Sequence, residues 1–245
     1  MGRTQSDNPH QKSETKALTA FFMGNSFCRL CQKDEKQLIS ELAICSKGIS
    51  AKGLSFANGS VQSARLPGST GIWTLSRNDA KPSFIDISNP SQLSESIPDI
   101  SIHAAIYRQR PDINAICHTR NPYTICAAAG GSLEKVHGEA ALILGDIPVI
   151  DYNLTGPYLE LISKASIGEP LRPIRTVILA GNGVLGLGAC IHEARAFVEI
   201  LEEWAMFKIF SKIHGKTVNV LTLEQLRSLG SRYARSIKFG GRQSA

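Results

Sequence analysis

The chain has 245 residues, 42% of them hydrophobic, and a formal net charge of +6, which is enough for one large domain with a substantial core. No stretch approaches the ~18 consecutive apolar residues of a membrane span, and the polar N-terminal segment lacks the apolar core of a secretory signal. Six cysteines are too few for a disulfide scaffold and agree with a reducing compartment. We therefore expect a cytoplasmic protein without a membrane partner.

Residues 1–16 are predicted to be a disordered tail, because polar and charged residues dominate them. From Asp34 to Lys47 apolar residues recur at the spacing of one helix face, and Gly48 is predicted to end that helix. Turn residues then separate three short runs that predict an antiparallel meander. These runs are Gly59–Ala64, Gly71–Ser76 and Ser83–Ile87.

The second half of the chain alternates between predicted helices and strands. Helices are predicted at Ile102–Arg110, Tyr123–Ala129, Tyr158–Ile167 and His192–Lys212. Strands are predicted at Ile113–His118, Ala140–Ile143, Ile147–Tyr152, Thr176–Leu179 and Val184–Leu187. The consistent assembly is a single domain over residues 17–230, with a central mostly antiparallel sheet and helices on both faces.

The C-terminal segment, residues 231–245, carries four basic residues and no acidic residue, so it supplies four of the six net positive charges. Nucleic-acid binding is one interpretation of such a basic tail. No aromatic stacking platform or recognition motif accompanies it. We therefore favour a solvated or substrate-facing tail and expect no nucleic-acid partner.

The most informative motif is Asp99-x-x-x-His103, followed by an apolar strand that ends in His118-Thr119-Arg120. Residues two apart on a strand point to one face, so a His-x-His pair in this place would suit a Zn²⁺-like ion. Arg120 cannot be a ligand, because its guanidinium stays protonated and offers no lone pair. The pattern indicates either a metal-site scaffold that has lost a ligand or ordinary residues at a strand end.

This stretch, with Arg110-Pro111-Asp112 between its helix and its strand, resembles the class II aldolase/adducin family. The resemblance covers roughly residues 34–215, and continues through Gly145–Val149, Thr176–Gly188 and the helix that contains Glu193–Glu202. It implies the family's three-layer α/β/α fold, of class α/β, with a central mostly antiparallel sheet. It also implies a homotetramer, a fourfold ring with its active sites between subunits.

In class II aldolases, three histidines bind a divalent cation that polarises the substrate carbonyl, and an acidic residue moves the proton. By resemblance, His118 matches the first ligand, Arg120 stands at the second, and Asn182, or Gly181 beside it, stands at the third. Asp99 matches the acid. Two of three ligands are missing, so we expect no metal cofactor. Our hypothesis is that Arg120 replaces the metal and stabilises an enolate or binds a carboxylate.

Two further residues are candidate proton carriers by the same resemblance. Glu139 lies two residues after His137 and resembles a second proton-transfer acid of the pentulose-phosphate epimerase branch. Tyr233, in the basic tail, would act from a segment that covers the active site in the family. A packing role is the alternative for Tyr233.

The residues at the family's phosphate pocket differ from its usual pattern, which combines a Gly-Asn turn, a Thr-Gly turn and a Ser-Ser pair. Asn58-Gly59 resembles the first turn, and Ser76-Arg77 occupies the second. Ile97-Pro98 replaces the serine pair, which removes two hydroxyl donors. Arg77 is either an anion contact or a surface residue. The pattern favours a small carbonyl or carboxylate substrate, such as a biosynthetic intermediate, over a sugar phosphate.

Three functions compete for this sequence. The first is a metal-independent lyase-type enzyme that makes or breaks a carbon–carbon bond next to a carbonyl, or performs related enolate chemistry. The second is a non-catalytic adducin-like module that works through assembly. The third is an iron-dependent oxygenase, which the missing histidines disfavour. Fold alone does not decide between them.

Overall fold

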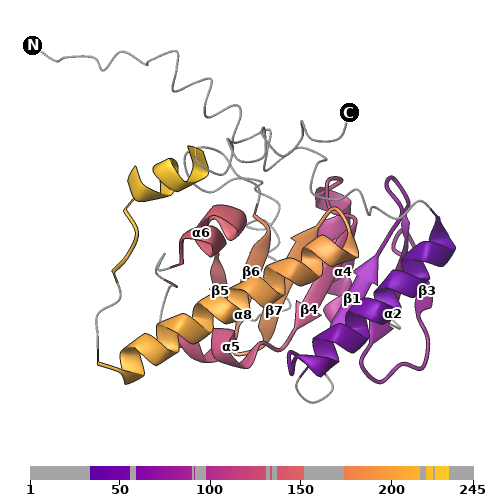
Figure 1. The fold of residues 1–245 in the computed structure, drawn as a ribbon. Coiled ribbons are helices and arrows are strands. Elements are labelled where there is room, and N and C mark those ends of the chain that lie inside the picture. Colours follow the sequence, from indigo (N-terminus) through magenta and orange to yellow (C-terminus); the bar gives the residue numbers. More distant parts are fainter. Residues whose placement is uncertain are drawn as a thin grey trace, which may run out of the picture.

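The computed structural model, drawn in Figure 1, describes residues 34–55, 59–89, 91, 98–130, 133, 137–151, 174–215, 219–222 and 224–231. The predicted disordered tail, the predicted helix Tyr158–Ile167 and residues 232–245 lie outside the described residues. Among the described helices, none combines the length and the apolar content that a membrane crossing requires.

Within the described residues, seven strands form one sheet in the order β3-β2-β1-β4-β7-β6-β5. Every neighbouring pair is antiparallel except β5 and β6, which confirms the prediction of a mostly antiparallel central sheet. The strands are β1 (Val61–Ala64), β2 (Gly71–Ser76), β3 (Ser83–Asp86), β4 (Ala115–Thr119), β5 (Val149–Asp151), β6 (Thr176–Ala180) and β7 (Gly183–Gly188).

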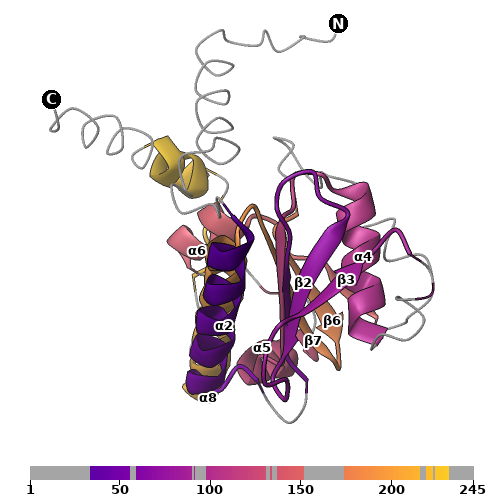
Figure 2. The ribbon, with the colours of Figure 1, turned by 90° about the vertical axis from the view of Figure 1, so that its right-hand side faces the viewer.

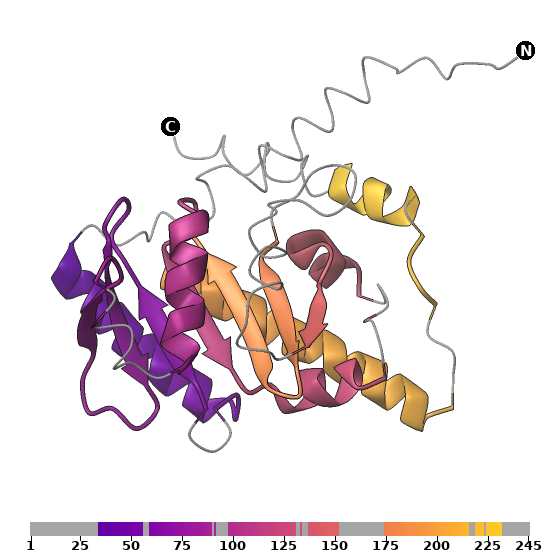
Figure 3. The same ribbon diagram turned by 180° about the vertical axis from the view of Figure 1, so that it is seen from behind.

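Helices cover both faces of this sheet, as Figure 2 shows in an edge-on view. One face carries α2 (Glu35–Ala51), α6 (Gly138–Leu144) and α8 (Ile191–Ile213), while α4 (Pro98–Gln109) lies on the other. The short helix α5 (Pro122–Ala128) packs against α8. Figure 3 shows the sheet from behind, with α4 lying across it. This arrangement is the α/β/α layering that the sequence predicted.

Three predicted elements differ from the structure by more than two residues, and one of them is helix α4, which begins at Pro98 and not at Ile102. Helix α2 does not end at Gly48 but continues to Ala51, and the glycine instead leaves room for the Arg195 side chain that crosses the helix. A Cβ at Gly48 would lie 2.4 Å from Arg195 Nη1. The predicted strand Ala140–Ile143 is wrong, since the segment is part of α6. Short apolar runs fit a strand or a helix equally well, and here the His137 side chain caps the helix by accepting from the Ala140 amide.

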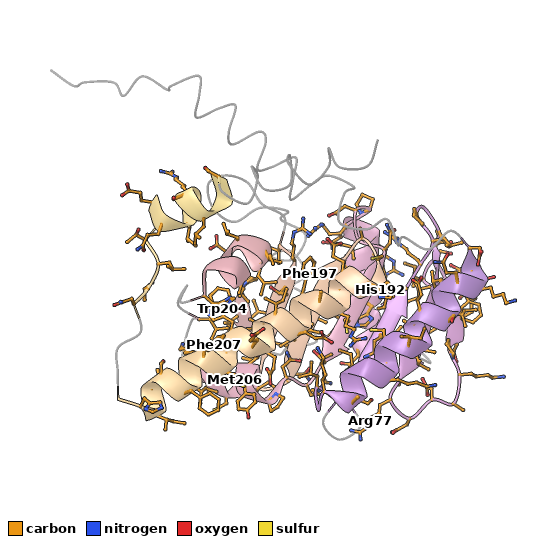
Figure 4. All side chains as sticks on the ribbon, viewed as in Figure 1. Arg77, His192, Phe197, Trp204, Met206 and Phe207 are labelled. Atoms are coloured by element: carbon orange, nitrogen blue, oxygen red, sulfur yellow. The ribbon has the colours of Figure 1, made fainter. Side chains whose placement is uncertain are left out.

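Apolar side chains pack on both faces of the sheet. Helices α2, α6 and α8 cover one core, in which Phe197 and Trp204 of α8 are buried (Figure 4). The second core lies beneath α4 and includes Ile116 of β4. Because side chains alternate along a strand, Cys117 belongs to the first core and His118 lies on the α4 side.

The described cysteines do not all share one state. Cys45, Cys117 and Cys126 are free, but Cys190 at the start of α8 is in a disulfide. Cys45 and Cys117 are buried, whereas Cys126 is exposed.

Candidate active site

The candidate site is built where β4 ends, next to the first turn of α4 and the turn between β6 and β7. The β4 residue His118 pairs across the sheet with Val61 of β1 and Leu185 of β7. Its side chain is completely buried. Arg120 follows β4, and its amide donates to the Leu54 carbonyl at 2.9 Å. The sheet register thus brings the end of the His-x-Arg motif to the edge of the α4-covered face.

Four predicted site residues meet at this point. Arg120 Nη1 lies 2.6 Å from His118 Nε2, and Arg120 Nη2 donates to Asp99 Oδ2 at 3.2 Å. His118 Nε2 is also 3.1 Å from Asn182 Oδ1, and His118 Nδ1 is 3.7 Å from Asp99 Oδ1. The sequence motif and the distant Gly181-Asn182-Gly183 turn therefore form one cluster.

The contacts assign the tautomer of His118. Arginine is always a donor, so His118 Nε2 must accept from Arg120. The proton of the neutral ring is then on Nδ1, the nitrogen that faces the Asp99 carboxylate. Burial, reinforced by the charge of Arg120, lowers the pKa of His118 to about 3, although the neighbouring Asn182 side chain opposes this shift. His118 is thus a neutral residue that orients the Arg120 guanidinium.

Two glycines make room for Arg120. A Cβ on Gly59 would lie 2.6 Å from Arg120 Nε, and a Cβ on Gly183 would lie 3.0 Å from Arg120 Nη1 and 2.2 Å from the Thr119 carbonyl oxygen. Contacts this short require a neighbour to move. A side chain at Gly183 would therefore meet rigid backbone, whereas a side chain at Gly59 would push the Arg120 side chain out of its place.

Sequence reasoning missed the buried polar network behind His118. His103 Nδ1 is 2.8 Å from Ser63 Oγ, Ser63 Oγ is 2.9 Å from the Tyr107 hydroxyl, and that hydroxyl donates to the Ser63 carbonyl at 3.0 Å. The rings of His103 and His118 are 5.8 Å apart. The signal in the sequence was the Asp99-x-x-x-His103 spacing, which places both side chains on one face of α4.

His103 is also held neutral. Burial is the main cause that lowers its pKa to about 3; His118 and Arg120 act in the same direction, and Asp99 opposes them. Among the described residues, His103 Nε2 and His118 Nδ1 have no hydrogen-bond partner. Two fully buried neutral imidazoles therefore lie side by side beneath the cluster.

We expect acid to destabilise the fold through these two histidines. Their pKa values in the folded chain lie below the value of about 6.5 in an unfolded chain, so the stabilisation is complete above that pH and is lost as the pH falls towards 3. Each histidine should lower the free energy of unfolding by about 1.4 kcal/mol per pH unit in this range. Urea unfolding at pH 7, 6 and 5 measures the slope. His103→Gln should remove about half of it; an unchanged slope would contradict this assignment.

Two residues predicted at the phosphate pocket, Ser76 and Arg77, form hydrogen bonds within the protein. The Arg77 guanidinium donates to the Ser55 carbonyl, and its amide donates to the Ser60 carbonyl at 3.1 Å. The Ser76 amide donates to Asp79 Oδ2 at 2.8 Å. Gly59, the third residue predicted at this pocket, lies against the Arg120 side chain. Asn58, Tyr233 and the Glu139 side chain lie outside the described residues, and Glu139 is placed only by its backbone in α6.

The donor set does not fit the divalent cation of class II aldolases. A zinc ion would need a position about 2.0–2.1 Å from an imidazole nitrogen, but Arg120 Nη1 already lies 2.6 Å from His118 Nε2. A second contact of this nitrogen is with the side-chain amide of Asn182, so neither of these contacts is with a second histidine. Within the described ranges, no group of three or more His, Cys, Asp or Glu side chains could hold a metal ion.

Sequence comparison relates the chain to L-fuculose phosphate aldolases and to beta-adducins. It is 31% identical over 130 residues to the L-fuculose phosphate aldolase of Methanococcus vannielii, an alignment that spans 52% of this chain and 68% of that protein. Human beta-adducin is 32% identical over 130 residues, which is 51% of this chain and 17% of adducin. The chain spans 57% of the fuculose phosphate aldolase of Methanococcus maripaludis, at 34% identity over 44% of this chain.

Structural comparison supports the same fold. The L-fuculose-1-phosphate aldolase of Thermus thermophilus superposes with a TM-score of 0.63 at 18% identity, over 76% of this chain and 100% of that one. The L-fuculose 1-phosphate aldolase of Glaciozyma antarctica gives a TM-score of 0.64 at 15% identity, over 90% and 97%. The family model described as the class II aldolase and adducin N-terminal domain matches residues 41–209. With its three-layer fold and this match over most of its length, the chain belongs to the class II aldolase and adducin family.

Proposed function

We propose that this chain is a lyase-type enzyme for carbonyl or enolate chemistry on a small carbonyl or carboxylate substrate, with Arg120 in place of the family's cation. The observation that carries the proposal is the 2.6 Å contact between Arg120 Nη1 and His118 Nε2. It holds a fixed positive charge beside His118, the residue that matches the family's first ligand by resemblance. A pre-oriented guanidinium stabilises charge that develops on an enolate oxygen.

Asp99 is the proton carrier in this proposal. In the retro-aldol direction, it removes the proton of the substrate hydroxyl, the carbon–carbon bond breaks, and the electron pair moves onto the carbonyl oxygen as an enolate. The Arg120 guanidinium binds that oxygen, and Asp99 returns the proton to the enolate carbon. Both side chains are near the solvent boundary, with 13% of Asp99 and 16% of Arg120 exposed, so a small substrate can reach them.

The test is aldehyde release from β-hydroxycarbonyl compounds with and without EDTA. The panel should include fuculose 1-phosphate, the substrate in the names of the relatives, and 4-hydroxy-2-oxo acids, which carry no phosphate. We expect the chain to turn over at least one compound. EDTA should not change the rate of this turnover, and Arg120→Lys should abolish it. Turnover that stops with EDTA and returns with Zn²⁺ would contradict the role of Arg120.

A non-catalytic, adducin-like role is the second candidate, favoured by the similarity to beta-adducin and by the altered ligand positions. In that case Arg120, Asp99 and His118 would only stabilise the fold. No compound of the panel would then be turned over, and the variants would change stability without changing any reaction.

We also propose a homotetramer with cyclic symmetry and the site at subunit interfaces, because the family resemblance implies it and ring closure would cover the exposed edge of the Arg120 cluster. Multi-angle light scattering at micromolar concentration should give about four times the monomer mass of 26.5 kDa. A monomer under those conditions would refute this arrangement.

A further inference from the structure

Two arginine–aspartate pairs in this chain differ in geometry. Arg110 donates to both oxygens of Asp112, from Nε to Oδ1 at 2.7 Å and from Nη2 to Oδ2 at 2.6 Å, which is the strong two-point arrangement. Arg120 makes one contact with Asp99, at 3.2 Å. The second oxygen of Asp99 is directed towards His118 Nδ1 at 3.7 Å, which is too long for a hydrogen bond. Asp99 is thus a weaker partner for Arg120 than Asp112 is for Arg110.

Arg120 has contacts other than Asp99 that hold its side chain in place. His118 Nε2 holds one guanidinium nitrogen at 2.6 Å, and the backbone at Gly59 and Gly183 borders the rest of the side chain. The contacts with His118 and Asp99 use two of the five N–H groups that a guanidinium offers. A ligand that displaces Asp99 would therefore meet a donor pair that is already oriented, which lowers the entropic cost of binding.

A second polar group lies next to this donor pair. The Asn182 side chain is 3.1 Å from His118 Nε2, but the single lone pair of that nitrogen already accepts from Arg120. The amide of Asn182 therefore retains hydrogen-bonding capacity, whichever way its oxygen and nitrogen are oriented. A ligand whose carboxylate binds Arg120 would place the oxygen of its neighbouring carbon between the guanidinium and Asn182, so the same oxygen still meets the charge of Arg120 when it becomes an enolate.

We propose that Arg120 and Asn182 bind a small 2-oxo or 2-hydroxy carboxylate, whose carboxylate replaces that of Asp99 on the Arg120 guanidinium. This ligand class rests on the function proposed above and narrows its substrate. The exchange also has a consequence for the reaction. The Asp99 carboxylate leaves Arg120 only when the ligand binds, and it then lies beside the bound ligand. Asp99 is then released to act as the proton carrier by the substrate itself.

Calorimetric titration of the full chain with pyruvate and with propionate tests the proposal without any variant. The two probes have the same charge and chain length, but only pyruvate has an oxygen at carbon 2. We expect pyruvate to bind about tenfold more tightly, the difference that one good hydrogen bond makes. Equal affinities, or no saturable pyruvate binding up to about 10 mM, would overturn the assignment.

Variants then separate the two contacts. Arg120→Lys should weaken pyruvate binding at least tenfold, since an ammonium cannot make the planar two-point contact, whereas Arg108→Lys, a matched change on the exposed side of α4, should leave it unchanged. Asn182→Ala should remove the preference for pyruvate over propionate but keep propionate binding. Asp99→Asn should tighten binding of both probes, because it removes the competing carboxylate.

The sign of the Asp99→Asn effect is decisive. If that change weakens binding as much as Arg120→Lys does, Asp99 is a structural partner and no exchange occurs. Binding and turnover are measured separately. If pyruvate binds through Arg120 but no compound is turned over, the proposed lyase activity is wrong and the ligand class stands. If only substrates without a carboxylate are turned over, the lyase activity stands and the ligand class is wrong.

Discussion

Replacing Arg120 and Asn182 together by histidine should create a tight zinc site. In the double variant, His118 and a histidine at 120 would lie on one face of the β4 edge, two residues apart. The residue at 182 already reaches within 3.1 Å of His118 Nε2. The change also removes the guanidinium nitrogen from its position 2.6 Å from that same atom. We expect Zn²⁺ affinity to rise by a factor on the order of 10³ or more. The corresponding gain in binding free energy is only a fraction of the ~10–16 kcal/mol with which a full ligand set binds structural zinc.

Mass spectrometry of the purified wild-type chain should find far less than one transition metal per subunit.

Competition with a chromophoric chelator measures the zinc affinity of the double variant. Arg120→Ala is the matched control. It removes the cation and adds no ligand, so its affinity should stay within a small factor of wild type. If the double variant binds zinc no better than this control, Asn182 and Arg120 do not stand at ligand positions.

The second large effect should appear in catalysis. Asp99→Asn should lower kcat by a factor of about 10² to 10⁴, because the amide cannot accept the proton. Arg120→Lys should lower kcat by about 10² to 10³, the loss that follows removal of an oriented oxyanion donor. The two residues contact each other at 3.2 Å, so their combined effect should be less than the product of the separate effects.

His118→Gln provides the comparison for both variants. Glutamine keeps an acceptor for Arg120, and His118 in this mechanism only orients the guanidinium, so the loss in kcat should be smaller than for either change above. Steady-state kinetics on a compound turned over in the EDTA-treated panel supplies the values, with circular dichroism to show that each variant is folded. Wild-type kcat in both Asp99→Asn and Arg120→Lys would mean that the cluster is not catalytic.

The sequence alone determined the elements with strong periodic patterns. The predicted strand Gly71–Ser76 matches β2 to the residue, and the hairpin around Gly181-Asn182-Gly183 and the long helix α8 were located within one or two residues. These segments combine a clear apolar pattern with turn residues at both ends. The errors at Gly48 and at Ala140–Ile143 occurred where a glycine leaves room for a crossing side chain and where a local cap forms, features that the apolar pattern does not show.

The same division holds for the site. The types of residue at His118 and Arg120 were sufficient to predict that Arg120 cannot be a metal ligand, since no fold gives a guanidinium a lone pair. Only the tertiary structure decided which atoms meet. Asn182 lies 64 positions from His118, and Ser63 lies 40 positions from His103. Sheet register and helix packing bring these pairs together, and one sequence carries no local pattern for contacts of that range.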